Sequence, residues 1–197
     1  MGILSSSVSV TRYKVKSNPE KPFLEKVYNG LTQNAIQEID DHPLEKTVGW
    51  TSFENPYIPD FEGSSFVIGP YLVFSMRLDR KSIPPKVIQK HYAIEMARQL
   101  EKSGRKYLSR NEKKSIKDHV IDVLSLRIPA TPNIYDLIWN MEESWLWFFS
   151  NLKAANEELE TLFSKSFRLS LIRLFPYTTA DLMSGLLLQL SPTKFTE

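Results

Sequence analysis

Basic residues concentrate in one segment of the 197-residue sequence, between Arg77 and Asp118. This segment holds thirteen basic and five acidic residues, a net charge of +8, whereas the rest of the chain carries −6 and the whole chain +2. Such an uneven distribution creates a local positive potential, which is typical of a binding site for a polyanion. The densest part is Lys102, Arg105, Lys106, Arg110, Lys113 and Lys114.

The chemistry that this segment favours is contact with DNA phosphates. Lysine and arginine neutralise phosphate charge, and no asparagine or glutamine is interleaved with them on one recognition face to read base edges. We therefore expect DNA binding that depends on salt and on duplex length and has little sequence specificity. The candidate DNA-contacting residues are Lys86, Lys90, Arg98, Lys102, Arg105, Lys106, Arg110, Lys113, Lys114 and Lys117.

Signatures of catalysis are missing from the sequence. His42, His91 and His119 lack metal-ligand spacing, and there is neither a G-x-S-x-G motif nor a glycine-rich phosphate loop. The absence of cysteine excludes thiol catalysis and cysteine-based metal sites. We expect a protein that is not an enzyme and has no metal or cofactor. A two-metal nuclease built from distant carboxylates is the enzyme alternative.

The basic segment has two further interpretations. It is a solvated helical surface without a ligand, or it binds an acidic protein partner or a second copy of the chain, whose remainder is net negative. The aromatic pairs Trp139/Trp147 and Phe148/Phe149 have two interpretations as well, base stacking or burial in the core, and alternating strand positions favour the core.

Helical periodicity places the basic residues on a pair of helices. Pro84-Pro85 suits the first turn of a helix over about 85–102, which ends at Ser103-Gly104. Ser109 and Glu112 have the S-x-x-E spacing of a capping box that begins a second helix, over about 109–126. Because the connection is short, we expect an antiparallel helical hairpin.

The remaining periodicities predict the body of the fold. Strands are expected at 5–16, at 66–78 and from Phe167 to Leu171, with a β-hairpin formed by 135–139 and 145–149. Helices are expected at 21–33, 151–165 and 179–190, and an acidic surface loop at 37–43. The predicted fold class is α+β, a largely antiparallel sheet with packed helices and the basic αα-hairpin inserted as a lobe. The predicted domains are a central one, 1–82 with 128–197, and the lobe, 83–127.

The expected cellular location rests on two sequence signals, a signal peptide and a membrane-spanning stretch. Met1-Gly2-Ile3-Leu4 has neither a basic start nor an apolar stretch of signal-peptide length, and no stretch approaches the roughly 20 apolar residues that span a membrane. We expect a cytoplasmic protein without membrane contact.

Two stretches of the sequence resemble the family of the recombination-associated protein RdgC. They are the run from Arg80 to Ile88, R-K-S-I-P-P-K-V-I, and the run from Gly104 to Val120, G-R-K-Y-L-S-R-N-E-K-K-S-I-K-D-H-V. Gly49-Trp50 stands where the family has a Gly-Trp pair, and the resemblance covers roughly residues 45–175. Members of the family are usually about half as long again, so the sequence resembles a short form that lacks much of the C-terminal part.

This resemblance implies a homodimer that binds double-stranded DNA in an electropositive ring, associates with the nucleoid and restrains a RecA-like recombinase. It implies that Lys81 adds positive charge to the DNA-binding surface, as do the clusters around Arg105 and Lys113. It also implies that Arg127, at the tip-side end of the second helix, is one of the DNA-binding residues. The family has an aromatic residue shortly after that position, where this chain reads Ile128-Pro129, so a different tip contact is expected.

Overall fold

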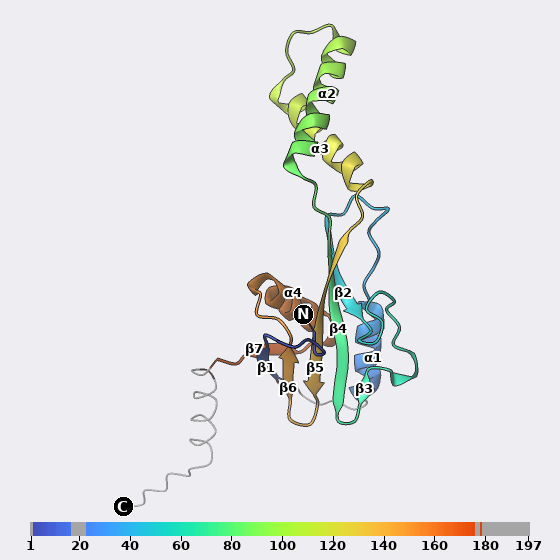
Figure 1. Ribbon diagram of the computed structural model, residues 1–197, viewed down its shortest axis with the longest axis vertical. Coiled ribbons are helices and arrows are strands. Elements are labelled where there is room, and N and C mark those ends of the chain that lie inside the picture. The colour runs from blue at the N-terminus through green and yellow to red at the C-terminus, as the bar shows by residue number, and fades with distance from the viewer. Residues whose placement is uncertain (1, 17–22, 176–177, 179–197) are drawn as a thin grey trace, which may run out of the picture. The chain divides into compact units, whose positions relative to one another are not determined.

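The computed structural model describes residues 2–16, 23–175 and 178. Several strands follow one another directly along this part of the chain, as do the two helices α2 and α3, an order typical of an α+β fold (Figure 1). The elements are β1 Thr11–Lys16, α1 Phe23–Gln33, β2 Lys46–Thr51, the short 3-10 helix η1 Glu62–Ser64, β3 Val67–Ile68, β4 Tyr71–Arg80, α2 Pro85–Ser103, α3 Arg110–Ser125, β5 Thr131–Asn140, β6 Trp145–Phe148, α4 Lys153–Phe167 and β7 Ser170–Arg173.

One hydrogen-bonded sheet contains all the described strands, in the order β2-β4-β5-β6-β1-β7, with the short β3 paired to β4. The pairs β1–β6, β1–β7, β3–β4 and β5–β6 are antiparallel. The β5–β6 pair is the predicted β-hairpin, with Leu137 opposite Phe148. The predicted α+β class with a largely antiparallel sheet is therefore confirmed.

The chain divides into two compact units. Unit 1 comprises Met1–Ala35, Trp50–Met76 and Ile134–Glu197, and unit 2 comprises Ile36–Gly49 and Arg77–Asn133. The predicted lobe, 83–127, lies inside unit 2, which also takes in the loop before β2 and the adjoining ends of three strands.

The core of unit 1 lies between one sheet face and the helices α1 and α4. Every second residue of β1 is buried, so Tyr13 and Val15 point into the core. The Trp139 ring packs against Phe163 of α4 and Phe23 of α1, with ring centroids 5.0 and 5.3 Å apart. Trp139 is 1% exposed, which confirms the core interpretation for this residue.

The two helices of unit 1 approach each other closely at Gly30. A Cβ atom at this position would lie 2.7 Å from the backbone oxygen of Ser166 and 2.8 Å from the Phe167 ring. The contact therefore requires glycine, although a glycine inside a helix costs up to about 1 kcal/mol relative to alanine. This close contact fixes the position of α1 against α4 beside the aromatic core.

Two predicted strands begin at other residues in the structure. The first strand begins at Thr11, not at residue 5. Phe167, predicted to open a strand, ends α4, because it continues the four-residue spacing from Phe163 and packs on Trp139. Arg168 then ends the helix in a left-handed conformation (φ 56°). The helix expected at 179–190 and the first two residues of the one expected at 21–33 lie outside the described residues.

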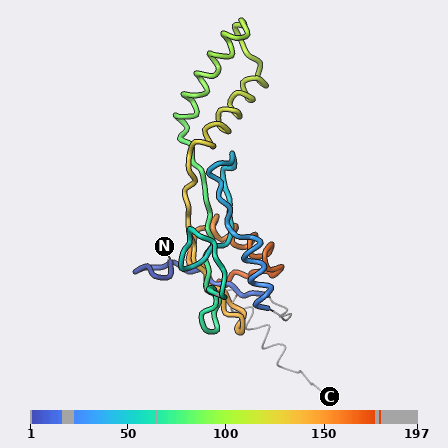
Figure 2. The backbone as a smooth tube through the Cα atoms, turned by 90° about the vertical axis from the view of Figure 1, so that its right-hand side faces the viewer, coloured from blue at the N-terminus to red at the C-terminus, as the bar shows by residue number. Residues whose placement is uncertain are grey.

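Unit 2 contains the two helices that carry the basic segment. Figure 2 shows α2 and α3 lying side by side and joined by a short loop, as predicted for a helical hairpin. Their small apolar interior includes Leu108, Val120 and Leu124, whereas α2 has only half-buried or exposed side chains. Few buried apolar contacts imply low local stability, so we expect α2 to open more readily than α4.

Candidate nucleic-acid interface

The loop between α2 and α3 is fixed at both ends by local interactions. Gly104 ends α2 in the left-handed conformation (φ 61°) that glycine adopts without strain. Ser109 begins α3 with the predicted capping box: its hydroxyl accepts from the Glu112 amide at 3.2 Å, and its amide donates to the Glu112 carboxylate at 2.8 Å. The sequence thus places the basic residues on either side of this loop at defined positions.

Four basic residues lie on one face of α3. Arg110, Lys113, Lys114 and Lys117 have the spacing i, i+3, i+4, i+7, which brings side chains onto one helical face. All four are exposed. The first three lie beside the end of α2 and the loop, which contribute three more exposed cations. We call these six residues the tip cluster: Lys102, Arg105, Lys106, Arg110, Lys113 and Lys114.

The other predicted contacts lie farther along the hairpin. Arg98 and Lys117 adjoin the tip cluster, whereas Lys86 and Lys90 lie in the first turns of α2. At 1.5 Å per residue, Lys86 and Lys102 are roughly 24 Å apart along the helix axis. Arg127 corrects the expectation drawn from the resemblance, because it follows the C-terminal end of α3 and so lies at the end of the hairpin opposite the tip. All of these side chains are exposed, but the structure does not gather them into one patch.

Carboxylates engage only part of this positive charge. Arg105 pairs with Glu112 at 3.2 Å and Arg98 with Glu95 at 3.8 Å. Hydrogen bonds with Ser109, from its backbone first and its side chain second, together with the Arg105 charge, lower the pKa of Glu112. Lys106, Lys113 and Lys114 form no ion pair with any residue that the structure describes. These ammonium groups are available to an anionic ligand.

Lys81 corrects the expectation drawn from the resemblance, because it is buried within unit 2 and only 5% exposed. Its ammonium donates hydrogen bonds to the backbone oxygens of Asp40 at 2.9 Å, His42 at 2.8 Å and Ser125 at 2.6 Å. An ammonium has three hydrogens, so its donors are used. Ser125 is the last residue of α3, where a cation also interacts favourably with the helix dipole. Lys81 is therefore a structural residue and cannot lie on the DNA surface as placed.

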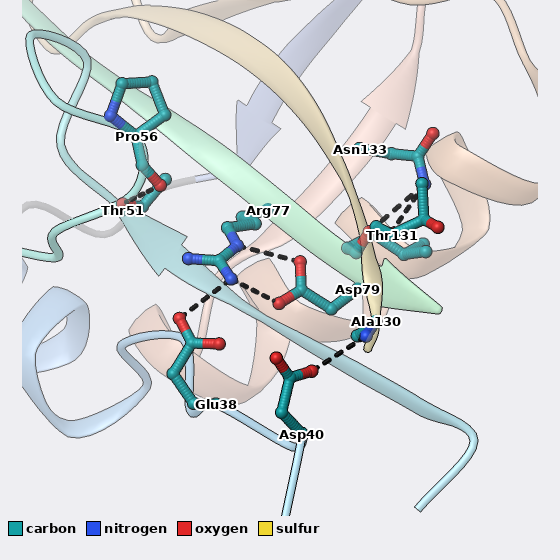
Figure 3. A network of polar contacts seen from close by, with 10 residues as sticks. Glu38, Asp40, Thr51, Pro56, Arg77, Asp79, Ala130, Thr131 and Asn133 are labelled. Atoms are coloured by element: carbon teal, nitrogen blue, oxygen red, sulfur yellow. Dashed lines mark hydrogen bonds and ion pairs between the residues drawn. The ribbon is translucent and has the colours of Figure 1, made fainter. Parts of the chain in front are cut away.

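Arg77, one of the thirteen basic residues counted above, is also structural. Its guanidinium donates to both oxygens of Asp79, at 2.8 and 2.6 Å, and to Glu38 at 2.9 Å (Figure 3). Burial alone would lower the pKa of Arg77, but the hydrogen bonds that it donates to Asp79 and Glu38 and the attraction of their charges together outweigh burial and raise the pKa. The charge of Arg77 is balanced inside unit 2.

One exposed residue of the tip escaped the sequence reasoning. Tyr107 lies between Lys106 and the start of α3 and is 83% exposed, the greatest exposure of any aromatic side chain that the structure describes as exposed. The sequence feature that would have identified Tyr107 is an aromatic residue outside any apolar periodicity in a segment rich in cations. A ring in that position can contact a sugar or base while its neighbours contact phosphates.

No group of three or more histidine, aspartate or glutamate side chains in the described parts of the chain is arranged to hold a metal ion. No described helix is long and apolar enough to cross a membrane.

The fold and the exposed cations define an α+β protein with a basic helical hairpin. The sequence model of the RdgC family, with the description "Putative exonuclease, RdgC", matches residues 9–193. The chain belongs to this family, which confirms the resemblance seen in the sequence and fits a recombination-related role. No curated protein matches the chain.

Proposed function

We propose that this protein binds double-stranded DNA without sequence preference, through phosphate contacts made by the tip cluster. The observation that carries the proposal is the group of exposed lysines, Lys106, Lys113 and Lys114, that have no carboxylate partner among the described residues. Release of the counterions condensed on DNA gives such a surface its affinity, so binding falls steeply with salt. The proposed role is in recombination, which family membership supports.

The proposal extends to the setting in which the protein acts. We infer that it is a cytoplasmic, nucleoid-associated homodimer that has no catalytic activity and restrains a RecA-like recombinase. Membership of the family supports the recombination-related part of this role, whereas the family description names an exonuclease, so the absence of catalysis is tested directly. Light scattering with and without duplex DNA measures the dimer, and incubation of plasmid with Mg²⁺ or Mn²⁺ tests the non-catalytic part. Cleavage of the plasmid would replace this proposal with a nuclease.

The DNA-binding surface is tested by reversing its charge. We expect Lys106→Glu/Lys113→Glu/Lys114→Glu to abolish the gel shift of unrelated duplexes at physiological salt, because three phosphate contacts become repulsive. The changed side chains are exposed, so the fold should persist. The control is Lys153→Glu/Lys165→Glu/Arg168→Glu, which changes the charge equally on exposed residues at α4.

The outcomes separate the candidate functions. Loss of binding in the tip variant and retention in the control support the proposal. Equal loss in both would show a dependence on total charge, and the tip cluster would then not be the site. If the unaltered protein shifted no duplex even at low salt, binding of an acidic protein partner or self-association would be the better interpretation of the basic hairpin.

A further inference from the structure

The sheet in unit 1 has a second face, opposite the one that α1 and α4 cover. Residues alternate between the faces, so Tyr13 and Leu146 point to the core while Arg12 and Trp147 point away from it. Trp147 is 39% exposed although it lies within a strand near the middle of the sheet order. An apolar side chain of this size left in water at such a position requires an explanation.

Trp147 belongs to a row of three exposed or half-buried aromatic rings on this outer face. Its ring stacks on that of Trp145, with centroids 4.8 Å apart and planes 29° from parallel. Trp145 in turn lies 5.9 Å from Tyr71, the first residue of β4, which is 37% exposed. We call Tyr71, Trp145 and Trp147 the outer aromatic row.

Cations lie directly beside this row on the neighbouring strand. In the β1–β6 register, Arg12 is opposite Trp147 and Lys14 is opposite Trp145. Residues opposite each other in an antiparallel pair have Cβ atoms about 5 Å apart. The Lys14 ammonium donates to the backbone oxygen of Glu143 at 2.8 Å, which leaves two of its three hydrogens for a ligand.

Two carboxylates near this face accept hydrogen bonds from neutral donors and so keep their negative charge. Asp136 is buried, accepts from the Ser75 hydroxyl at 2.8 Å and accepts from the Ile3 amide at 2.8 Å. The Glu143 carboxylate accepts from the Trp145 indole. The Arg12 guanidinium forms no ion pair with another described residue. The face therefore offers exposed rings with two cations, Arg12 and Lys14, directly beside them.

We propose that the outer aromatic row is a binding site for single-stranded nucleic acid. Unpaired bases would stack on Trp147, and the adjoining phosphates would contact Arg12 and Lys14. A duplex hides the faces of its bases, so the rings select for single strands, whereas the cations distinguish this surface from one that binds an uncharged apolar partner. The site uses unit 1 only and does not depend on the tip cluster.

The experiment separates this site from the basic hairpin. Intrinsic tryptophan fluorescence is titrated with a ten-nucleotide oligothymidine in the background of Lys106→Glu/Lys113→Glu/Lys114→Glu. Trp50 and Trp139 are buried, so quenching reports the two outer tryptophans. We expect quenching by the oligomer and none by an abasic oligomer of the same length, which keeps the phosphates and lacks the bases. Oligouridine determines whether RNA binds as well.

Substitutions then locate the site. Trp147→Leu should weaken binding of the oligomer by about tenfold, since stacking of one base is lost. Trp147→Phe, which keeps a ring, should retain most of the affinity, and Arg12→Gln should lower the salt dependence. The matched control is Tyr57→Leu, which removes an exposed ring of unit 1 outside the row.

Two results would overturn the inference. One is equal binding of the abasic and the thymidine oligomers, and the other is unchanged affinity of a folded Trp147→Leu variant. Either would leave the outer row as an element of sheet packing. Duplex binding by the unaltered protein would be unaffected by these results, so the proposed function stands or fails separately.

Discussion

The cations of unit 2 fall into two groups with opposite environments. Arg77 and Lys81, at the end of β4, are buried, and each is held by several oxygen acceptors. Lys106 and Lys113, at the tip of the hairpin, are exposed and have no carboxylate partner within the described part of the chain. All four lie in the same positively charged stretch of sequence. Net charge along the sequence therefore does not measure the positive charge that a ligand meets.

The two groups of cations differ in when they lose their water, the buried ones on folding and the exposed ones only on binding a ligand. A buried charge is tolerated only if protein groups replace the water that it loses, and removing one member of such a set leaves the others buried without partners. An exposed lysine keeps its water until a ligand arrives. Substitutions of the two buried cations should thus lower stability, whereas substitutions of the exposed tip lysines should change binding alone.

The largest expected effect is that of Arg77→Met. It leaves Asp79, whose side chain is 0% exposed, without its main partner, so we expect a loss of about 3–5 kcal/mol in the free energy of unfolding. Urea denaturation measures the loss. The double variant Arg77→Met/Asp79→Leu removes both charges and should recover much of it. A single variant as stable as the parent would show that Arg77 does not balance a buried charge.

A smaller loss is expected for Lys81→Met, about 2–3 kcal/mol. Methionine fills similar space but donates no hydrogen bond, and three backbone oxygens, including the last one of α3, lose their partner. Lys102→Met makes the same chemical change at an exposed position and should alter the free energy of unfolding by less than about 0.5 kcal/mol. Similar losses in the two variants would contradict the division into two groups.

The parts of the fold that local rules specify could be predicted from the sequence. The capping box at Ser109 and the glycine that ends α2 depend on residues within one helical turn of each other, and both are found where the sequence placed them. The β5–β6 hairpin is equally local, since five residues separate its apolar runs. Short-range interactions fix these features, so a single sequence contains the necessary information.

Features that depend on distant segments could not be predicted. The burial of Lys81 requires the loop that contains Asp40 and His42, about forty positions earlier in the chain. The two strand tryptophans Trp139 and Trp147 give a second example, because only the packing of α1 and α4 against the sheet decides which of them is covered. Such choices need the tertiary arrangement.

The smallest expected effect is at the N-terminal end of α3, where the Ser109 cap orders the tip of the hairpin. Ser109→Ala removes the hydroxyl that caps the Glu112 amide and should lower stability by about 1 kcal/mol. Because exposed Lys106 and Arg110 flank the cap, we expect faster hydrogen exchange at the first amides of α3 and weaker DNA binding. Unchanged exchange there would show that the cap does not hold the tip.

The charge of Glu112 adds a pH dependence to the same cap. The pKa of Glu112 is lowered in the folded protein, so its carboxylate stabilises α3 fully above the unfolded value of about 4.3 and loses this effect as the pH falls through the folded value. Glu112→Gln keeps the hydrogen-bonding shape without the charge. In this variant the first amides of α3 should exchange faster than in the parent at pH 7, and the difference should shrink only as the pH falls below about 4.3 and through the folded value. A difference independent of pH would assign the effect to geometry instead of charge.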